Sequence, residues 1–108
     1  MYELFKSEAS GKYHFRLKAG NGEIILSSEA YEAKPSAENG IASVKKNGTD
    51  RKNFEIRQSS SGKSYFVLKA GNGQIIGQSQ QYVTEAAAEN GIASVIKNAG
   101  GETKDLTA

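Results

Sequence analysis

Basic and aromatic side chains alternate near the N-terminus in a pattern that suits single-stranded nucleic acid. Phe5 lies in one alternating segment, and His14, Arg16 and Lys18 occupy every second position of the next. If both segments are strands, these side chains share one face, where rings stack on bases and cations neutralise phosphates. The matching positions of the second half are Arg57, Tyr65, Val67 and Lys69, which weakens the pattern. The net charge of +2 also gives little counterion release. His14, Arg16, Lys18 and Lys69 are thus a weak candidate surface, and nucleic acid is a disfavoured partner.

The inventory of metal ligands and catalytic side chains is small. His14 is the only histidine, and the chain has no cysteine. A metal site would therefore depend on scattered carboxylates, and thiolate chemistry is excluded. General-base catalysis by His14 would need a positioned partner and a pocket, and the sequence indicates neither. We expect no catalytic residue, no metal site and no cofactor.

Two glycine-rich turns begin like a dinucleotide-binding fingerprint: Gly20-Asn21-Gly22 and Gly71-Asn72-Gly73. That fingerprint, G-x-G-x-x-G, joins a strand to a helix whose N-terminus meets the pyrophosphate. Here an apolar strand pattern follows each turn, and Ile25 and Ile76 stand where the third glycine belongs. The pattern therefore predicts two β-hairpins, in which Asn-Gly supplies the positive φ angles that tight turns need.

Polar pairs in two helical segments, Glu38-Asn39 and Glu89-Asn90, are each followed by a glycine, Gly40 and Gly91. These pairs could line a symmetric ligand site. A glycine inside a helix costs about 1 kcal/mol relative to alanine, and close approach of two backbones is its simplest explanation. We therefore favour packing at a helix contact, with Asn39 and Asn90 as satisfied buried or half-buried groups, over ligand contact.

All of these motifs recur at a spacing of 51 residues, because the chain is an internal duplication. Residues 11–49 laid on 62–100 are identical at about 23 of 39 positions. One copy of roughly 51 residues would bury only about 60% of its unfolded surface and would be marginal alone. We expect one domain over residues 1–108, made of two repeats at about 1–51 and 52–108 that share a core.

Each repeat is predicted to contain three strands, a helix and a fourth extended segment. Apolar residues alternate at period two in the strand segments and recur at helical spacing after Tyr31 and Tyr82. Pro35 suits the first turn of the first helix, Thr84 suits the N-cap of the second, and glycines at 48, 100 and 101 suggest left-handed helix ends. The expected strands are 2–6, 12–19, 23–28, 54–58, 63–70 and 74–79, with extended segments at 49–53 and 102–106.

The two motifs together resemble a known family. Leu-Lys-Ala-x-Asn-Gly-x-Ile-Ile and Asn-Gly-Ile-x-Ser-Val-x-Lys-Asn, each present in both copies, are similar to the YegP-like family of small uncharacterised prokaryotic domains. The resemblance covers nearly the whole chain. It implies an α+β fold of two β(3)-α-β motifs, in which a two-copy chain mimics the intertwined dimer of single-copy relatives, and it implies no established activity.

The sequence supports no specific function. We expect a non-enzymatic binding or protein-interaction module whose partner is a protein or a small ligand. The alternatives are a nucleic-acid-associated accessory protein and an enzyme with a shallow site. The segment Met1–Lys6 lacks the hydrophobic stretch of a signal peptide, so we expect a cytoplasmic location and no membrane association. The intact chain should be mainly a monomer with an internal pseudo-dimer.

Overall fold

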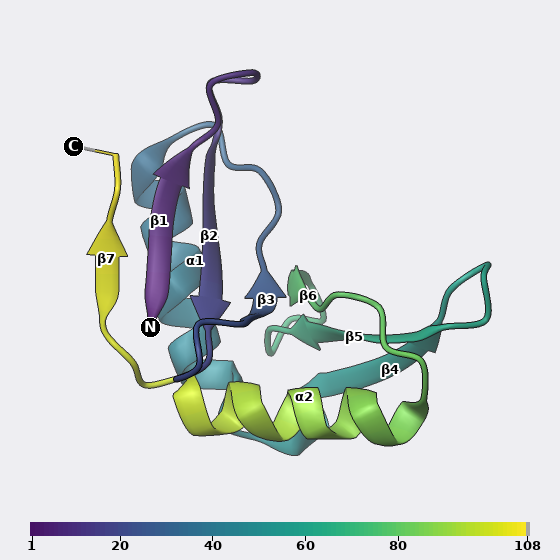
Figure 1. Ribbon diagram of the computed structural model, residues 1–108. Helices are drawn as coiled ribbons and strands as arrows, with labels where there is room; N and C mark the ends of the chain where they lie inside the picture. The colour runs from purple at the N-terminus through teal and green to yellow at the C-terminus, as the bar shows by residue number, and fades with distance from the viewer. Residues whose placement is uncertain (108) are drawn as a thin grey trace.

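A computed structural model describes residues 1–107 as a seven-stranded sheet with two helices (Figure 1). The α+β class and the two repeats are therefore confirmed. The elements, in chain order, are β1 (Tyr2–Lys6), β2 (Tyr13–Lys18), β3 (Ile24–Ser27), α1 (Lys34–Asn47), a 3₁₀ turn η1 (Arg51–Asn53), β4 (Phe54–Gln58), β5 (Ser64–Lys69), β6 (Ile75–Gln78), α2 (Glu85–Asn98) and β7 (Thr103–Asp105). Neither helix is long and apolar enough to cross a membrane.

The sheet is pseudo-symmetric about its centre. Its strand order is β4-β5-β6-β3-β2-β1-β7, so the two repeats meet where β3 runs antiparallel to β6. Ser27 pairs there with Gln78, which is its own counterpart 51 residues later. Strand β7 pairs in parallel with β1, and within residues 1–107 no counterpart of β7 lies at the β4 edge. Strong twist turns the β1–β2 hairpin nearly across the β4–β5 hairpin in Figure 1.

Each helix begins as its sequence predicts. Pro35 lies in the first turn of α1, where its missing N–H leaves no intrahelical hydrogen bond unmade. Thr84 is the N-cap of α2, and its hydroxyl accepts a hydrogen bond from the Ala87 N–H at 3.1 Å. Helix α1 packs on strands of both repeats, including β2 and β6, and α2 likewise packs on β5 and β3. The helices therefore link the two repeats on one face of the sheet.

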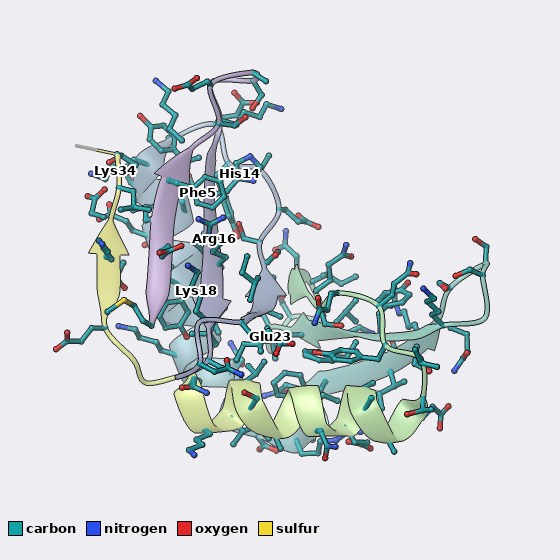
Figure 2. The ribbon with its side chains drawn as sticks, in the orientation of Figure 1. Phe5, His14, Arg16, Lys18, Glu23 and Lys34 are labelled. Atoms are coloured by element: carbon teal, nitrogen blue, oxygen red, sulfur yellow. The ribbon has the colours of Figure 1, made fainter. Side chains whose placement is uncertain are left out.

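Strand alternation sends the two sets of side chains to opposite faces. Phe15 and Leu17 are buried toward the helices, while Phe5, His14 and Arg16 lie on the face away from α1 (Figure 2). We call that uncovered face the open face. It carries Glu3, Phe5, His14, Arg16 and Lys18 in the first repeat and Glu55, Arg57, Tyr65 and Lys69 in the second. Strand alternation places Val67 on the same side, but Val67 is buried.

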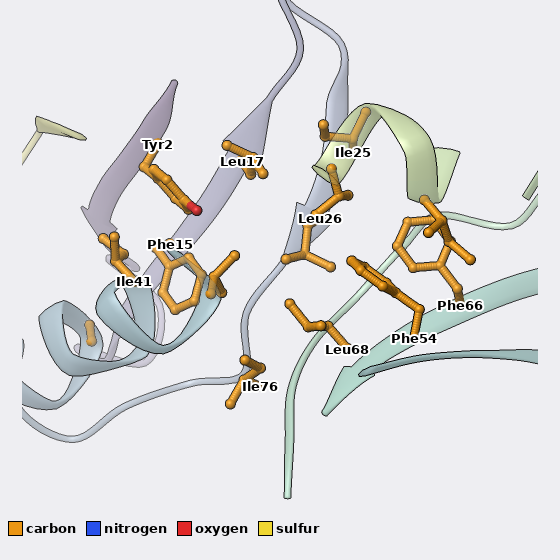
Figure 3. Packing of buried hydrophobic residues seen from close by; sticks show 14 of the residues in the cluster. Tyr2, Phe15, Leu17, Ile25, Leu26, Ile41, Phe54, Phe66, Leu68 and Ile76 are labelled. Carbon is orange, nitrogen blue, oxygen red and sulfur yellow. The ribbon is translucent and has the colours of Figure 1, made fainter. Parts of the chain in front are cut away.

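One cluster of buried side chains extends through both repeats. Figure 3 shows Phe15 and Leu17 of the first repeat in the same cluster as Phe54, Phe66 and Leu68 of the second. Within residues 1–107, every fully buried side-chain nitrogen or oxygen has a hydrogen-bond partner. One such group is the Tyr2 hydroxyl, which donates to the Ala99 carbonyl at 2.6 Å at the end of α2.

Three local predictions are corrected by the structure. Residues 49–53 are not an extended strand, because the chain forms η1 there and passes directly into β4. By analogy with β7 on β1, this segment would have to run parallel to β4, and two parallel strands need a connection of a dozen or more residues. The helix ends are not left-handed, because Gly48 has φ −76° and neither Gly100 nor Gly101 has a positive φ. Glycine at position 48 instead avoids a close contact, since a Cβ atom on it would lie 2.6 Å from the Val44 carbonyl oxygen.

The structure also adds detail to the predictions for the hairpin turns and the helix glycines. Within the two Gly-Asn-Gly turns, the positive φ angles are those of Gly22 and Gly73, each 84°, and the Asn21 side chain accepts a hydrogen bond from the Glu23 N–H at 3.0 Å. The loop is the three-residue kind, in which a left-handed glycine ends the turn. Gly40 and Gly91 lie in tight contacts as predicted. Their neighbours, however, are aromatic side chains rather than another backbone.

Candidate binding surface

The open face of the first repeat is organised around one carboxylate. Glu3 on β1 accepts a hydrogen bond from Arg16 Nε at 2.7 Å and lies 3.2 Å from Lys18 Nζ, both on β2. The Arg16 hydrogen bond is the main reason that the pKa of Glu3 lies below its ordinary value. Both cations that the sequence singled out are thus already paired within the chain.

The aromatic part of the same face is also covered. The Phe5 ring stacks on His14 with 5.4 Å between ring centroids and 13° between planes. The Arg16 guanidinium carbon lies 4.7 Å from the centroid of the Phe5 ring (Figure 2). A ring that packs on an imidazole and a guanidinium has little free surface on which a base could stack.

Lys69 lies apart from the other three candidate residues. It is on β5, which β6 and β3 separate from β2. Its Nζ is 3.4 Å from Glu55, whose other partner is Arg57 Nε at 2.7 Å. The hydrogen bond from Arg57, followed by that from Lys69, lowers the pKa of Glu55. The prediction brought His14, Arg16 and Lys18 together correctly, but Lys69 belongs to a second, separate ion cluster.

A polar cleft in the second repeat is a feature that the sequence reasoning missed. It has a volume of about 430 Å³ and lies between the β4–β5 turn and the segment after β6, over Tyr65 and Gln78. We call it the glutamine cleft. Its lining residues are Gln58, Ser59, Ser60, Tyr65, Gln78, Ser79, Gln80 and Gln81, all of them uncharged.

The same positions in the first repeat carry charge. Lys6 stands for Gln58, Glu8 for Ser60 and Glu29 for Gln80, while the imidazole of His14 stands for Tyr65. Amides and hydroxyls both donate and accept hydrogen bonds, so the glutamine cleft suits neutral polar partners such as peptide groups. The signal that could have revealed it is this replacement of charged residues by glutamine between the copies, which is visible once the repeats are aligned.

The hairpin turn of the first repeat lies close to the helix of the second repeat. A hollow of about 200 Å³ is lined by Asn21 and Glu23 of the first hairpin and by Tyr82, Asn90 and Gly91 of the second repeat. Asn39 and Asn90 are exposed, so their prediction as buried or half-buried polar groups is wrong. Asn90 lies at the edge of the hollow because α2 crosses toward the hairpin of the other repeat.

The acidic groups at the centre of the two ion clusters are held by basic side chains. The described residues contain no group of three or more His, Cys, Asp or Glu side chains placed to hold a metal ion. Within residues 1–107, the shifted pKa values belong to ion-paired groups such as Glu3 and Asp105 and to partly buried tyrosines such as Tyr31. Burial raises the pKa of Tyr31, which favours its neutral form and not a reactive phenolate.

Comparison with known proteins places the chain in a family. A family model described as a domain of unknown function (DUF1508) matches twice, at residues 8–55 and 59–105. The UPF0339 protein YegP of Yersinia pestis is 54% identical over 98% of this chain and 95% of its own length. YegP of Escherichia coli K12 is 52% identical over 98% of this chain and 96% of its own length.

Solved structures of relatives agree with the fold. The solution structure of yegP from E. coli has a TM-score of 0.92 and 51% identity, and it covers 99% of this chain and 92% of its own. That of UPF0339 protein SO3888 from Shewanella oneidensis has a TM-score of 0.90 and 48% identity, with coverage of 98% and 90%. These relatives are uncharacterised, so they establish no function. The two matches and the high identity over nearly the full length show that the chain belongs to the DUF1508 family, as a two-repeat, YegP-like member.

Proposed function

We propose that this chain is a non-enzymatic protein-interaction module that binds its partner at the glutamine cleft of the second repeat. The observation that carries the proposal is the asymmetry between two otherwise similar copies. One copy presents eight uncharged lining residues around an open hollow of about 430 Å³, and the other presents charges at matching positions. Neutral amides and hydroxyls beside a tyrosine ring are the kind of groups that protein interfaces use.

The alternatives receive less support. A single-strand platform needs free cations and free ring faces, whereas Arg16 and Lys18 are held by Glu3 and the Phe5 ring packs on His14. A catalytic site needs a group poised to exchange a proton or attack a substrate, and the cleft offers amides, hydroxyls and one phenol. Nucleic-acid binding and shallow-site catalysis therefore rank below protein binding.

The proposal includes the state and place of the protein. The intact chain acts mainly as a monomer with an internal pseudo-dimer, because the second repeat already covers the apolar surface of the first. The location is cytoplasmic, because small exported domains commonly depend on disulfides and this chain has no cysteine. Sedimentation of the intact chain and cell fractionation test these two points.

The test of the proposed function uses matched variants of the two repeats. Tyr65→Ala/Gln78→Ala alters the cleft, and His14→Ala/Ser27→Ala alters the same positions in the first repeat. Each variant and the natural chain are used for affinity purification from lysate, with mass spectrometry of proteins, nucleic acids and metabolites. A stoichiometric protein partner lost only with Tyr65→Ala/Gln78→Ala is expected. Salt-sensitive capture of RNA or DNA, or equal loss of the protein in both variants, would contradict the proposal.

A further inference from the structure

The outer edge of β1 is covered by β7, and this pairing shows how a strand docks on a repeat. The Tyr2 N–H donates to the Glu102 carbonyl at 2.7 Å, and the Leu106 N–H donates to the Leu4 carbonyl at 2.7 Å. Asp105 of β7 is opposite Leu4, and its carboxylate lies 2.6 Å from Lys34 Nζ at the start of α1. The docked strand thus has main-chain hydrogen bonds and one charge contact with the helix.

The matching edge of β4 is open beyond its first residue. The Phe54 N–H donates to the Arg51 carbonyl, and Arg51 Nη1 donates to the Phe54 carbonyl at 3.1 Å. Further along, no segment of residues 1–107 pairs with the outer side of β4. The reason is topological, since the chain that leaves α1 becomes β4 itself and cannot also run beside it.

The register identifies which groups lie on this open edge. Ser59 N–H donates to the Lys63 carbonyl, so the alternate residues Arg57 and Glu55 form the hydrogen-bonded pairs with β5. The main-chain groups of Ile56 and Gln58 therefore point outward. The Ile56 side chain is partly exposed. Its counterpart Leu4, which is paired with β7, is only 1% exposed.

The charge beside the edge is reversed between the repeats. Glu85 begins α2 where Lys34 begins α1, and Glu85 Oε1 lies 3.4 Å from Gln58 Nε2. A strand that docked on β4 as β7 docks on β1 would bring its residue opposite Ile56 close to Glu85. That residue should be a cation, because a carboxylate there would be repelled.

We propose that the outer edge of β4 binds an extended segment of another protein, parallel to β4, with a lysine or arginine opposite Ile56. This inference rests on the proposed function, whose cleft begins at the end of the same strand with Gln58. Strand addition of this kind gains affinity from main-chain hydrogen bonds and specificity from alternate side chains. A second copy of this chain is disfavoured as the donor of the segment, because its β7 would place Asp105 against Glu85.

The experiment uses the intact, ¹⁵N-labelled chain and two synthetic peptides. One copies residues 101–107, and the other copies them with Asp105→Lys. The lysine peptide should shift the amide signals of Ile56 and Gln58 at millimolar concentration and bind about two- to fivefold more tightly than the natural peptide. The Glu85→Lys variant should reverse this preference. Glu8→Lys, which makes the same change in net charge on the β1–β2 turn, should leave it intact.

Two further variants together separate the edge from the cleft. Gln58→Pro removes an outward N–H of the edge and also a side chain that lines the cleft. It should weaken the lysine peptide about tenfold, and the chain should still fold because proline is tolerated on sheet edges. Tyr65→Ala/Gln78→Ala should leave peptide binding in place, so a failed cleft and a failed edge give different results. Absence of shifts at Ile56 and Gln58, the same peptide preference in Glu85→Lys, or a concentration-dependent dimer abolished by Gln58→Pro would each overturn the proposal.

Discussion

The two repeats have the same strand and helix order, but they differ at the places where symmetry would be expected to matter most. The edge of β1 is covered by β7, and the edge of β4 is open beyond Phe54. Where β3 and β6 meet at the centre of the sheet, which is the pseudo-dyad, Leu26 faces Gly77. These two residues occupy the same position in the two repeats. Joining two copies in one chain allows each to change separately, so complementary pairs can replace identical ones.

The Leu26–Gly77 pair shows what the difference teaches. A Cβ atom on Gly77 would lie 3.0 Å from Leu26 Cγ and 3.1 Å from the Ser27 carbonyl oxygen. Leu26 is fully buried and fills the space that a second side chain would need. A symmetric pair of leucines would not fit between β3 and β6, whereas one leucine and one glycine do.

The largest expected effect comes from removing one repeat. Residues 1–51 alone should not form a stable monomer, because α1 packs partly on β6 and β5 of the missing half. We expect dimerisation or unfolding, measured by analytical ultracentrifugation and calorimetry. A monomeric half with a cooperative melting transition would show that each repeat has a core of its own.

Exchange at the pseudo-dyad should have the next largest effect. Leu26→Gly should lower the free energy of unfolding by about 2–5 kcal/mol through a cavity, and Gly77→Leu by about 1–3 kcal/mol through overpacking. The double variant moves the leucine to the other strand. It should therefore be more stable than the sum of the single changes by about 1–3 kcal/mol in chemical denaturation. Strict additivity would mean that the two positions do not share one space.

The helix glycines should show that both repeats use the same packing device. A Cβ atom on Gly91 would lie 2.5 Å from the Tyr82 hydroxyl oxygen and 2.9 Å from Phe66 Cε2. Gly91→Ala should lower the free energy of unfolding by about 1–3 kcal/mol, although alanine is the better helix former. Gly71→Ala, where the added Cβ meets nothing within 4 Å, is the control. A raised melting temperature for Gly91→Ala would contradict the contact.

Local sequence patterns predicted the strands and helices well, because strand alternation and helix capping depend on residues only a few positions apart. Alternation gave the six strands of the two hairpin sets within one or two residues at each end, and Pro35 and Thr84 marked the helix starts. The tight environment of Gly40 and Gly91 was also predicted. Its partner was not, because the aromatic pairs Phe15–Tyr31 and Phe66–Tyr82 come from positions that only the folded sheet brings under the helix.

The errors concern relations between distant segments. The prediction treated 49–53 and 102–106 alike, but only the second can run beside a strand, since the first continues directly into β4. Lys69 was grouped with the first-repeat cations because it matches Lys18 by repeat position, and the strand order separates the two lysines. The glutamine cleft is lined by residues of β4, β5, β6 and the segments that follow β4 and β6, and only the pairing of these strands brings positions 58 and 81 to the same hollow.

The smallest expected effect tests the charge contact of the covered edge. Hydrogen bonds from Lys34 and then from Thr107 lower the pKa of Asp105 to about 2. Since the folded pKa lies below the ordinary value of 3.8, the stabilisation is present above about pH 4 and is lost as the pH falls toward 2. Asp105→Asn should therefore melt slightly lower than the natural chain at pH 7, and the gap should close near pH 2. Amide exchange at Tyr2 and Leu4 reports whether β7 loosens in parallel.

Glu8→Gln, in the exposed β1–β2 turn, provides a control that should show no such pH-dependent gap. Asp105 is exposed and solvent screens the pair, so the difference should be small. A gap that stays constant from pH 7 to pH 2 would mean that the β1 edge is held by main-chain hydrogen bonds alone, and the reversed charge at Glu85 would then say little about what β4 binds.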